Sequence, residues 1–424
     1  MRGKIDINIG SQSGKFKSNS RLFDVLNRGS LVLIGTFVFL NPFPQITSIK
    51  EILFYLSTLI VLILLVFKKT KFSFRTPLLL PFGLFIFWAL FSIFFALDKG
   101  GSLRDFYSHL VKYIIFYYVM INLFKSRKGL DTLSWIIIIS ATVFSVGLLF
   151  YFHVVRGVPL STRLASGFKN SATDIIDFIT LFGLILSSHK CFKEKYLYRK
   201  IFLIFSLFPL FAVSFLTQSR GSLFAMVLAF IVLLFNKKKA LICFVGGLLI
   251  LIALSPMRGR VNINKWSNDP RIGLAYFSLE IIKDYPIVGT GFSIDTFRNT
   301  KLIDLEEYKA RIPEKFRSQP FLWPHNMFLS IGVRVGLVGL ALFVCILLVF
   351  VKMCWKMIKY GRDDFVRNWS ICILSAIVMF LVKGLCTPVF THFVDVIFYT
   401  ILSMATILWR LNEETSTRRA MEAE

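Results

Sequence analysis

Long apolar segments recur from one end of this chain to the other, and they limit its fold more than any other feature. A helix of about 20 apolar residues spans the hydrocarbon core of a membrane and satisfies its own backbone hydrogen bonds in lipid. Because none of the segments alternates like a strand, we predict an all-α, polytopic membrane protein with about twelve transmembrane helices. The predicted helices lie at residues 29–45, 51–67, 77–96, 105–124, 131–154, 172–188, 200–216, 221–235, 240–255, 327–351, 369–385 and 392–409.

The composition agrees with a membrane protein and excludes several other classes. Of the 424 residues, 55% are hydrophobic and only 17% are charged. Soluble proteins carry about 25% charged residues, so a soluble enzyme and a disordered chain are both excluded. The six cysteines show no Cys-x-x-Cys spacing, and the histidines match no metal signature. We therefore expect no disulfide framework, no metal site and no cofactor.

The positive charge follows the predicted topology. Lys and Arg number 50 against 24 Asp and Glu, a formal charge of +26 that in a soluble protein would suggest nucleic acid. Here the basic residues gather in alternate short connections, such as residues 68–75 and 237–239, while the short connections between them contain few Lys or Arg. Basic loops stay on the cytoplasmic side of a membrane. We therefore predict cytoplasmic termini and no nucleic-acid partner.

The same alternation divides the chain into five parts. We predict a cytoplasmic tail at 1–28, transmembrane helices 1 to 9 over 29–255, and a long outward-facing loop at 256–324 that carries helices of its own. Transmembrane helices 10 to 12 follow over 325–409, and a cytoplasmic tail occupies 410–424. Basic residues that remain on the outward side oppose the topology rule, so they are the better candidates for ligand binding.

Arg220 is the first of these candidates. It follows the turn Thr217-Gln218-Ser219 and opens a predicted span, and either Thr217 or Ser219 has the chemistry to cap that helix. A helix N-terminus presents free N–H groups and the positive end of the helix dipole. A guanidinium at that position makes a phosphate cradle at the membrane edge. The alternative is an arginine that only extends to the interface.

The argument of a cation at a helix start also applies to Asp269-Pro270-Arg271 in the long loop. Aspartate suits an N-cap and proline suits the first helical position, so we predict a helix here whose apolar face begins at Leu274. Arg271 then lies in the first turn, where a cation opposes the dipole. This placement suggests a bound anion, and a solvent-exposed arginine is the alternative.

Further candidates come from both sides of these two arginines. His325 lies just before the next span, and histidine exchanges a proton near neutral pH. Arg163 and Lys169 add charge near a glycine turn and suit the same anion or acidic headgroups. Asp174 and Asp177 share a helical face just inside a span, where acids are functional candidates or are paired with a basic residue.

Taken together and in this order, five pieces resemble the O-antigen ligase/polymerase family of bacterial envelope glycosyltransferases, with the strong part over 160–345. The pieces are Arg163 in a glycine-containing segment, Thr217-Gln218-Ser219-Arg220-Gly221, Asp269-Pro270-Arg271, Asp284-Tyr285-Pro286-Ile287-Val288-Gly289-Thr290-Gly291-Phe292, and Pro324-His325-Asn326 before a span with Gly336 and Gly339. A single large outward loop is a further point of similarity.

The resemblance implies an O-antigen ligase in the inner membrane of a Gram-negative bacterium. Such an enzyme carries out metal-independent, inverting glycosyl transfer on the periplasmic face. Its donor is a glycan on undecaprenyl diphosphate, and its acceptor is a sugar hydroxyl of the lipid A-core. Arginines in the positions of Arg220 and Arg271 engage the diphosphate, and the histidine in the position of His325 is tied to acceptor activation.

Other functions remain open from the sequence. An O-antigen polymerase of the same family is the nearest alternative, and a glycosyltransferase that acts on protein is a smaller one. A twelve-helix transporter fits the helix number and the cytoplasmic termini. It fits less well because the two halves show no convincing repeat and the outward loop is longer than gating needs.

Overall fold

The computed structural model describes residues 10–164, 173–254, 269–318, 324–361, 363–388 and 390–421. Within these ranges all regular structure is helical, which confirms the all-α prediction there. The α-helices are α1 (Gly10–Leu40), α2 (Thr47–Val66), α3 (Leu79–Ile93), α4 (Lys99–Asp105), α5 (Lys112–Leu123), α6 (Arg127–Leu149), α7 (Thr173–Cys191), α8 (Leu197–Leu216), α9 (Arg220–Leu233), α10 (Lys238–Leu254), α11 (Pro270–Asp284), α12 (Leu305–Arg311), α13 (Met327–Tyr360), α14 (Asp364–Gly384) and α15 (His392–Met421). Short π-helical turns extend α4 into α5 (Phe106–Val111) and prolong α6 (Phe150–Val155).

Every predicted span overlaps one of these helices, and the chain is a polytopic membrane protein. In the described residues, seven helices are long and apolar enough to cross a membrane. Two shorter apolar helices are Leu79–Ile93 and Arg220–Leu233. The count of about twelve crossings stays a prediction. The seven are Leu22–Leu40, Pro44–Val66, Arg127–Val155, Leu197–Leu216, Met327–Tyr360, Asp364–Gly384 and Phe393–Thr415.

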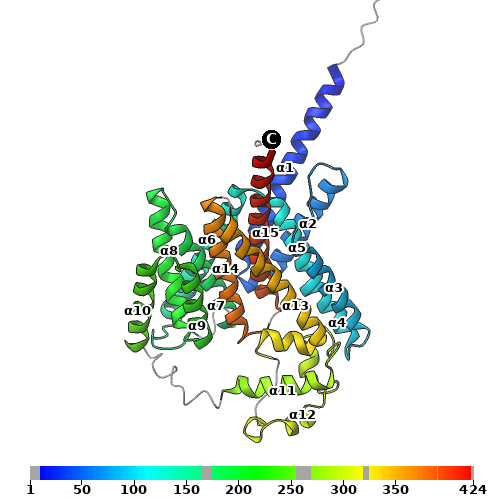
Figure 1. The fold of residues 1–424 in the computed structure, drawn as a ribbon, viewed down its shortest axis with the longest axis vertical. Helices are drawn as coiled ribbons and strands as arrows, with labels where there is room; N and C mark the ends of the chain where they lie inside the picture. The colour runs from blue at the N-terminus through cyan, green and yellow to red at the C-terminus, as the bar shows by residue number, and fades with distance from the viewer. Residues whose placement is uncertain are drawn as a thin grey trace, which may run out of the picture.

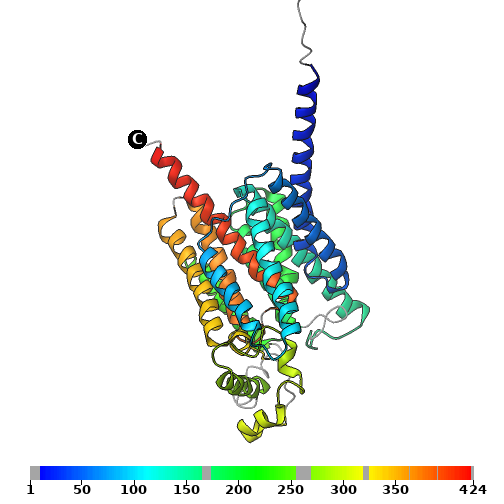
Figure 2. The same cartoon turned by 90° about the vertical axis from the view of Figure 1, so that its right-hand side faces the viewer.

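The long helices form one bundle with α15 near its centre. Of an 18-residue apolar window within Phe393–Thr415, 83% is buried, against 28% of such a window within Leu22–Leu40 in α1. In Figures 1 and 2 the outer part of α1 and the end of α15 leave the bundle at one end, and α11 and α12 lie beyond the opposite end. We call this opposite end the loop end of the molecule.

Helix α13 is broken about two turns after its start at the loop end. Val335 (φ −127°, ψ 15°) and Gly336 (φ 69°) are not helical, so the helix is interrupted near its start. Backbone groups freed by such a break must be satisfied away from water. They bond to the segment 286–291 and to one indole: Thr290 N donates to Val333 O (2.8 Å), Gly291 N to Arg334 O (3.0 Å), Leu337 N to Pro286 O (2.8 Å) and Trp88 Nε1 to Val335 O (2.9 Å).

Glycines on both sides allow the segment 286–291 to enter the break. A Cβ on Gly336 would lie 2.0 Å from the carbonyl oxygen of Ile287, and one on Gly289 would lie 2.6 Å from that of Val333. Both glycines also have positive φ, which side chains disfavour. The glycine turn that the sequence marks after α11 is therefore the part of the loop that joins the broken helix.

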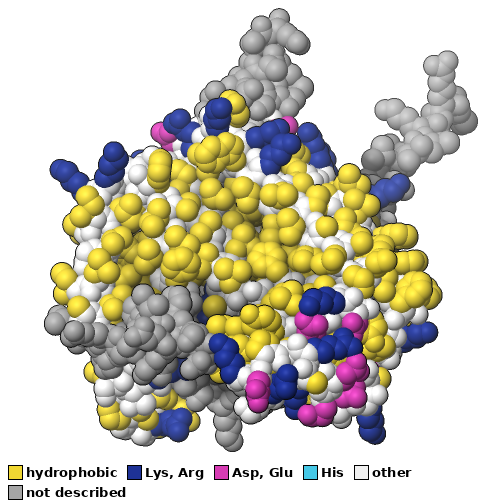
Figure 3. All heavy atoms as spheres, turned by 60° about the horizontal axis from the view of Figure 1, so that its bottom comes forward, with side chains coloured by type: hydrophobic (Ala, Val, Ile, Leu, Met, Phe, Trp, Pro, Cys, Tyr) yellow, Lys and Arg dark blue, Asp and Glu magenta, His cyan; other side chains and the backbone are white. Residues whose placement is uncertain are grey.

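The loop has a small hydrophobic core of its own. Leu274, Phe277 and Ile281 are buried on one face of α11, as the sequence predicts. They pack with residues of α12 and its flanking turns and with Val333 of α13, so this separate core rests against one helix of the bundle. Figure 3 shows an apolar band across the molecule, with Lys and Arg along its upper edge and side chains of both charge signs on the part that comes forward.

Candidate functional site

The turn before α9 places Arg220 at the first position of that helix. Ser219 is the N-cap, and its Oγ accepts the N–H of Ser222 at 3.4 Å, so of the two expected caps the structure selects Ser219. Gln218 has a left-handed backbone (φ 46°), which closes the turn between α8 and α9 within three residues. A left-handed conformation costs about 1–2 kcal/mol in a residue that has a Cβ. Arg220 is thus held at a sharp, strained turn at the loop end.

The start of α11 follows the predicted capping pattern. Asp269 is the N-cap, with its Oδ1 accepting the N–H of Arg271 at 3.0 Å, and Pro270 occupies the first helical position. The other carboxylate oxygen of Asp269 forms an ion pair with Arg220, at 2.5 Å from Nη2. One carboxylate therefore links the loop helix α11 to the bundle helix α9.

A third helix begins at the same place. Asn326 caps α13, and its Oδ1 accepts the N–H groups of Phe328 (2.9 Å) and Leu329 (3.1 Å). His325 immediately precedes this cap and is half-buried. The first two turns of α13 lie before the break, and the segment 286–291 bonds to their end, so it holds the part of α13 that His325 precedes.

These three helix starts line one cavity of about 690 Å³. Arg220 lies at the start of α9, Asp269 and Arg271 at the start of α11, and His325 and Asn326 at the start of α13. The described lining is otherwise apolar or small, apart from the thiol of Cys386. The remaining lining residues are Gly221, Phe224, Ile272, Leu274, Ala275, Pro324, Leu329, Leu385 and Cys386.

The arrangement favours an anion with an apolar attachment. Each helix start contributes the positive end of a helix dipole, and the lining adds two guanidinium groups against one carboxylate. Backbone N–H groups and arginines at helix starts bind phosphate groups with good geometry. The apolar walls accommodate a hydrocarbon chain or the face of a sugar ring. In the described residues, no group of three His, Cys, Asp or Glu side chains is placed to hold a metal ion.

The other predicted candidates lie away from the lining of this cavity, as far as the chain is described. Arg163 donates from Nε to the carbonyl of Thr217 at 2.9 Å, so it packs its segment against the turn before Arg220. Lys169 and the side chain of Asp174 lie outside the described residues. Asp177 is fully buried and forms an ion pair with Lys383, the structural pairing that the sequence leaves open as an alternative.

Sequence reasoning missed two residues of this region. Asn326 is an N-cap directly before an apolar run, a signal that was available in the sequence. Lys383 lies at the end of an apolar run, where the sequence marks it only as one more basic residue. Its partner in α7 is about two hundred residues away, so no local pattern identifies the pair.

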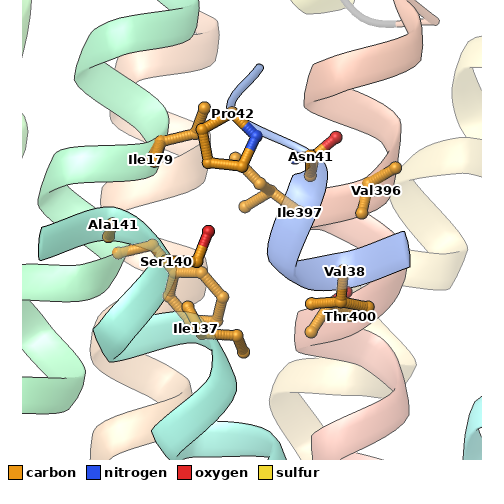
Figure 4. A pocket seen from close by; sticks show the side chains of 11 residues that line it. Val38, Asn41, Pro42, Ile137, Ser140, Ala141, Ile179, Val396, Ile397 and Thr400 are labelled. Carbon is orange, nitrogen blue, oxygen red and sulfur yellow. The ribbon is translucent and has the colours of Figure 1, made fainter. Parts of the chain in front are cut away.

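Two other cavities are less suited to a charged ligand. A cavity of about 30 Å³ between α1, α6, α7 and α15 has room for a water molecule only (Figure 4). Its polar lining is limited to Asn41, Ser140 and Thr400. A cavity of about 690 Å³ among α7, α8, α9 and α10 is lined by apolar side chains, together with Ser188 and Cys191. Neither has a charged side chain in its described lining.

Comparison with known proteins agrees with this geometry. Residues 205–344 match the model of a family described as O-antigen ligase. The match begins in α8 and ends in α13 beyond its break, so it includes all three helix starts of the cavity. Over these residues the chain is similar to the O-antigen ligase family. This similarity supports a ligase-family function and therefore an enzymatic one.

One relative extends the similarity beyond the matched region. The chain is 26% identical over 306 residues to a protein of Rickettsia bellii (strain RML369-C) named "Putative polysaccharide ligase". The alignment covers 69% of this chain and 71% of that protein. Because the three helix starts of the cavity lie within the matched residues, the cavity at the loop end is the natural place to look for the active site.

Proposed function

We propose that this protein is an O-antigen ligase of the Gram-negative inner membrane. It transfers a glycan from undecaprenyl diphosphate to a sugar hydroxyl of the lipid A-core, by inverting glycosyl transfer without a metal ion. The loop end faces the periplasm and both termini face the cytoplasm, in keeping with the distribution of Lys and Arg. The name of the Rickettsia relative favours a ligase over a polymerase.

One observation carries this proposal: Arg220, Arg271 and His325 line the same cavity, each at or directly before the start of a different helix. Undecaprenyl diphosphate leaves the sugar as an anion, so its departure is favoured by fixed positive charge at the leaving oxygen. The two guanidinium groups and the helix dipoles supply that charge. The apolar walls give the lipid-linked donor a place at the membrane surface.

The chemistry divides between the two kinds of side chain. Arg220 and Arg271 bind the diphosphate while the bond between the anomeric carbon and the phosphate oxygen breaks. His325 accepts the proton of the acceptor hydroxyl as that oxygen attacks the anomeric carbon from the opposite face. The new glycosidic bond has inverted configuration, and undecaprenyl diphosphate leaves with its charge held by the arginines.

Asp269 has a second part to play in this scheme. In the structure the carboxylate of Asp269 is paired with the guanidinium of Arg220, which the diphosphate of the donor also needs. An arginine has several N–H donors in a planar fork, so Arg220 can keep Asp269 on one edge and bind phosphate on the other. Asp269 then orients Arg220 and limits the net positive charge of the empty cavity.

The test is the lipopolysaccharide ladder of a strain that lacks this gene, complemented with single variants. Arg220→Ala, Arg271→Ala or His325→Ala is expected to leave the core uncapped while lipid-linked polymer accumulates. Lys301→Ala serves as the control, because Lys301 is an exposed loop cation outside the lining of the cavity. It is expected to restore the full ladder.

The same gel separates the alternatives. A core capped with a single repeat unit would indicate a polymerase instead of a ligase. Wild-type ladders from all three variants would show that the cavity takes no part in the reaction. In a purified system, His325→Gln is expected to lower turnover by about 10²-fold or more with little change in donor KM, as for loss of a general base.

A further inference from the structure

A buried ion pair lies next to the first turn of α9. Lys383 Nζ of α14 is 2.8 Å from Asp177 Oδ2 of α7, and the two side chains are 1% and 0% exposed. Charged groups inside a membrane bundle are costly, and removing one partner leaves the other uncompensated. Apolar residues of similar volume stabilise a core at least as well. The presence of this pair therefore suggests a role beyond holding α7 and α14 together.

The pair is directly connected to the turn that carries Arg220. Lys383 Nζ also donates to Ser219 Oγ at 3.3 Å, and Ser219 is the N-cap of α9. Ser219 is itself buried, so this contact is shielded from water. Three helices thus meet at one hydroxyl group, and Arg220 is the next residue along the chain.

The electrostatics of the contact are unusual. A cation is ordinarily unfavourable at a helix N-terminus, since it faces the positive end of the dipole. Here Asp177 compensates the charge of Lys383, which makes the arrangement tolerable. The ammonium can then donate to the N-cap hydroxyl, which an apolar residue at position 383 cannot do. The position of the N-cap is thereby tied to two other helices.

We propose that the Asp177–Lys383 pair is a positioning device that fixes the first turn of α9, and with it Arg220, for the diphosphate of the donor. This inference rests on the proposed function. Lys383 and Asp177 are positioning residues and do not touch the substrate. Small displacements of a charged group at a binding site weaken its interactions strongly, so the anchor affects donor binding more than it affects folding.

The experiment compares two double variants that each remove an ion pair made by a buried lysine. Asp177→Asn with Lys383→Met removes the pair at α9 and leaves no unpaired charge. Glu51→Gln with Lys112→Met is the matched control, because Lys112 is buried and lies 2.5 Å from Glu51 between α5 and α2. Purified proteins are assayed with a polyprenyl-diphosphate-linked oligosaccharide as donor and lipid A-core as acceptor.

The expected result is a change in one kinetic parameter. The Asp177–Lys383 double variant raises donor KM by about tenfold, the scale of one lost charge-assisted hydrogen bond, with kcat and acceptor KM changed less than about twofold. The Glu51–Lys112 double variant leaves donor KM unchanged even if its melting temperature falls by as much. Lys383→Arg, which keeps the charge and the donor, restores most of the donor affinity.

A second pair of variants covers the case in which the double variant does not fold. Ser219→Ala removes the hydroxyl that Lys383 contacts, and Ser126→Ala removes an equivalent cap from α6, where Ser126 Oγ accepts the N–H of Gly129 at 3.0 Å. Each loses about 1 kcal/mol of capping. Only Ser219→Ala is expected to raise donor KM.

The outcomes separate this inference from the function on which it rests. If Arg220→Ala abolishes transfer but the Asp177–Lys383 double variant or Ser219→Ala leaves donor KM within twofold, the positioning role is wrong and the ligase assignment stands. Equal rises in donor KM for the α9 variants and their controls also overturn it. If Arg220→Ala itself transfers glycan normally, the proposed function fails first.

Discussion

Arg220 and Asp269 form an ion pair, Nη2 to Oδ2 at 2.5 Å, that joins a helix of the bundle to a helix of the loop. The same carboxylate caps α11 by accepting the N–H of Arg271. Asp269 thus contacts both arginines of the cavity, the side chain of Arg220 and the backbone N–H of Arg271. This arrangement fixes their spacing without a ligand, and it makes Asp269 the residue whose charge can be changed with least disturbance to the backbone.

Asp269→Asn is expected to tighten the binding of inorganic pyrophosphate by several-fold. Asparagine caps a helix about as well as aspartate, so α11 stays in place. The described lining of the cavity, however, loses the carboxylate of Asp269. Calorimetry on the purified protein measures the affinity. Asp304→Asn is the control, because Asp304 caps α12 through the same kind of bonds outside the cavity lining. Unchanged or weaker binding would show that the cavity does not act as an anion site.

Gly336→Ala and Gly289→Ala are each expected to destabilise the protein by more than about 2 kcal/mol. A Cβ at either position meets backbone atoms of the facing segment, and both residues have positive φ. Thermal unfolding in detergent measures the effect. Gly246→Ala in α10 is the control, since a Cβ there meets nothing within 4 Å and alanine favours a helix. Equal stability of all three variants would contradict the described fit of 286–291 into the break.

Cys386 offers a direct probe of the cavity. All six cysteines are described and free, and Cys386 lines the cavity while Cys354 and Cys372 are buried. With Cys191, Cys243 and Cys345 replaced by serine, maleimide labelling of Cys386 is expected to slow several-fold when pyrophosphate or the lipid-linked donor is present. A protein that keeps Cys243 in place of Cys386 is expected to label at one rate with or without ligand. If neither ligand changes the labelling rate of Cys386, both ligands bind outside this cavity.

The loop carries a local pH dependence at Asp284. The hydroxyl of Tyr308 donates to Oδ2 of Asp284 at 2.7 Å, and this bond, helped by Arg311, lowers the pKa of that carboxyl below its ordinary value. Because the folded pKa is depressed, the contribution to stability is present above the unfolded pKa of about 4 and is lost as the pH falls through the folded value.

Limited proteolysis of the loop checks this dependence. Cleavage is expected to increase as the pH falls below about 4 in the wild type, because protonated Asp284 no longer holds Tyr308 and Arg311 as an anion. Asp284→Asn is expected to show more cleavage at neutral pH and a flatter profile. A wild-type profile that is already flat through this range would contradict the assignment.

Local signals in the sequence predicted much of this structure. The cap at Asp269, the proline at the first position of α11 and the buried face beginning at Leu274 all depend on residues a few positions apart. Capping chemistry and helical periodicity act at that range, so the pattern is sufficient. The interruption of α13 lies directly after Arg334, a charged residue in an otherwise apolar run of the sequence.

Long-range contacts could not be predicted in this way. The sequence marks Gly289 as part of a turn, but its fit against the backbone of α13 depends on a segment some forty residues later. Arg334, which a local reading marks as a polar interruption, donates to the carbonyl of Phe292 and packs against the rings of Phe292 and Phe390. The cavity itself is of this kind, because it exists only where three helices from distant parts of the chain begin together.

The seating of residues 286–291 in the gap of α13 has a consequence for engineering and for evolution. Main-chain hydrogen bonds across that gap make the segment 286–291 and helix α13 a single mechanical piece. A chimera that exchanges only the segment between α10 and α13 would leave unmatched amides in a water-poor layer. Grafts between relatives should therefore carry both parts together, with the crossover placed after Leu337.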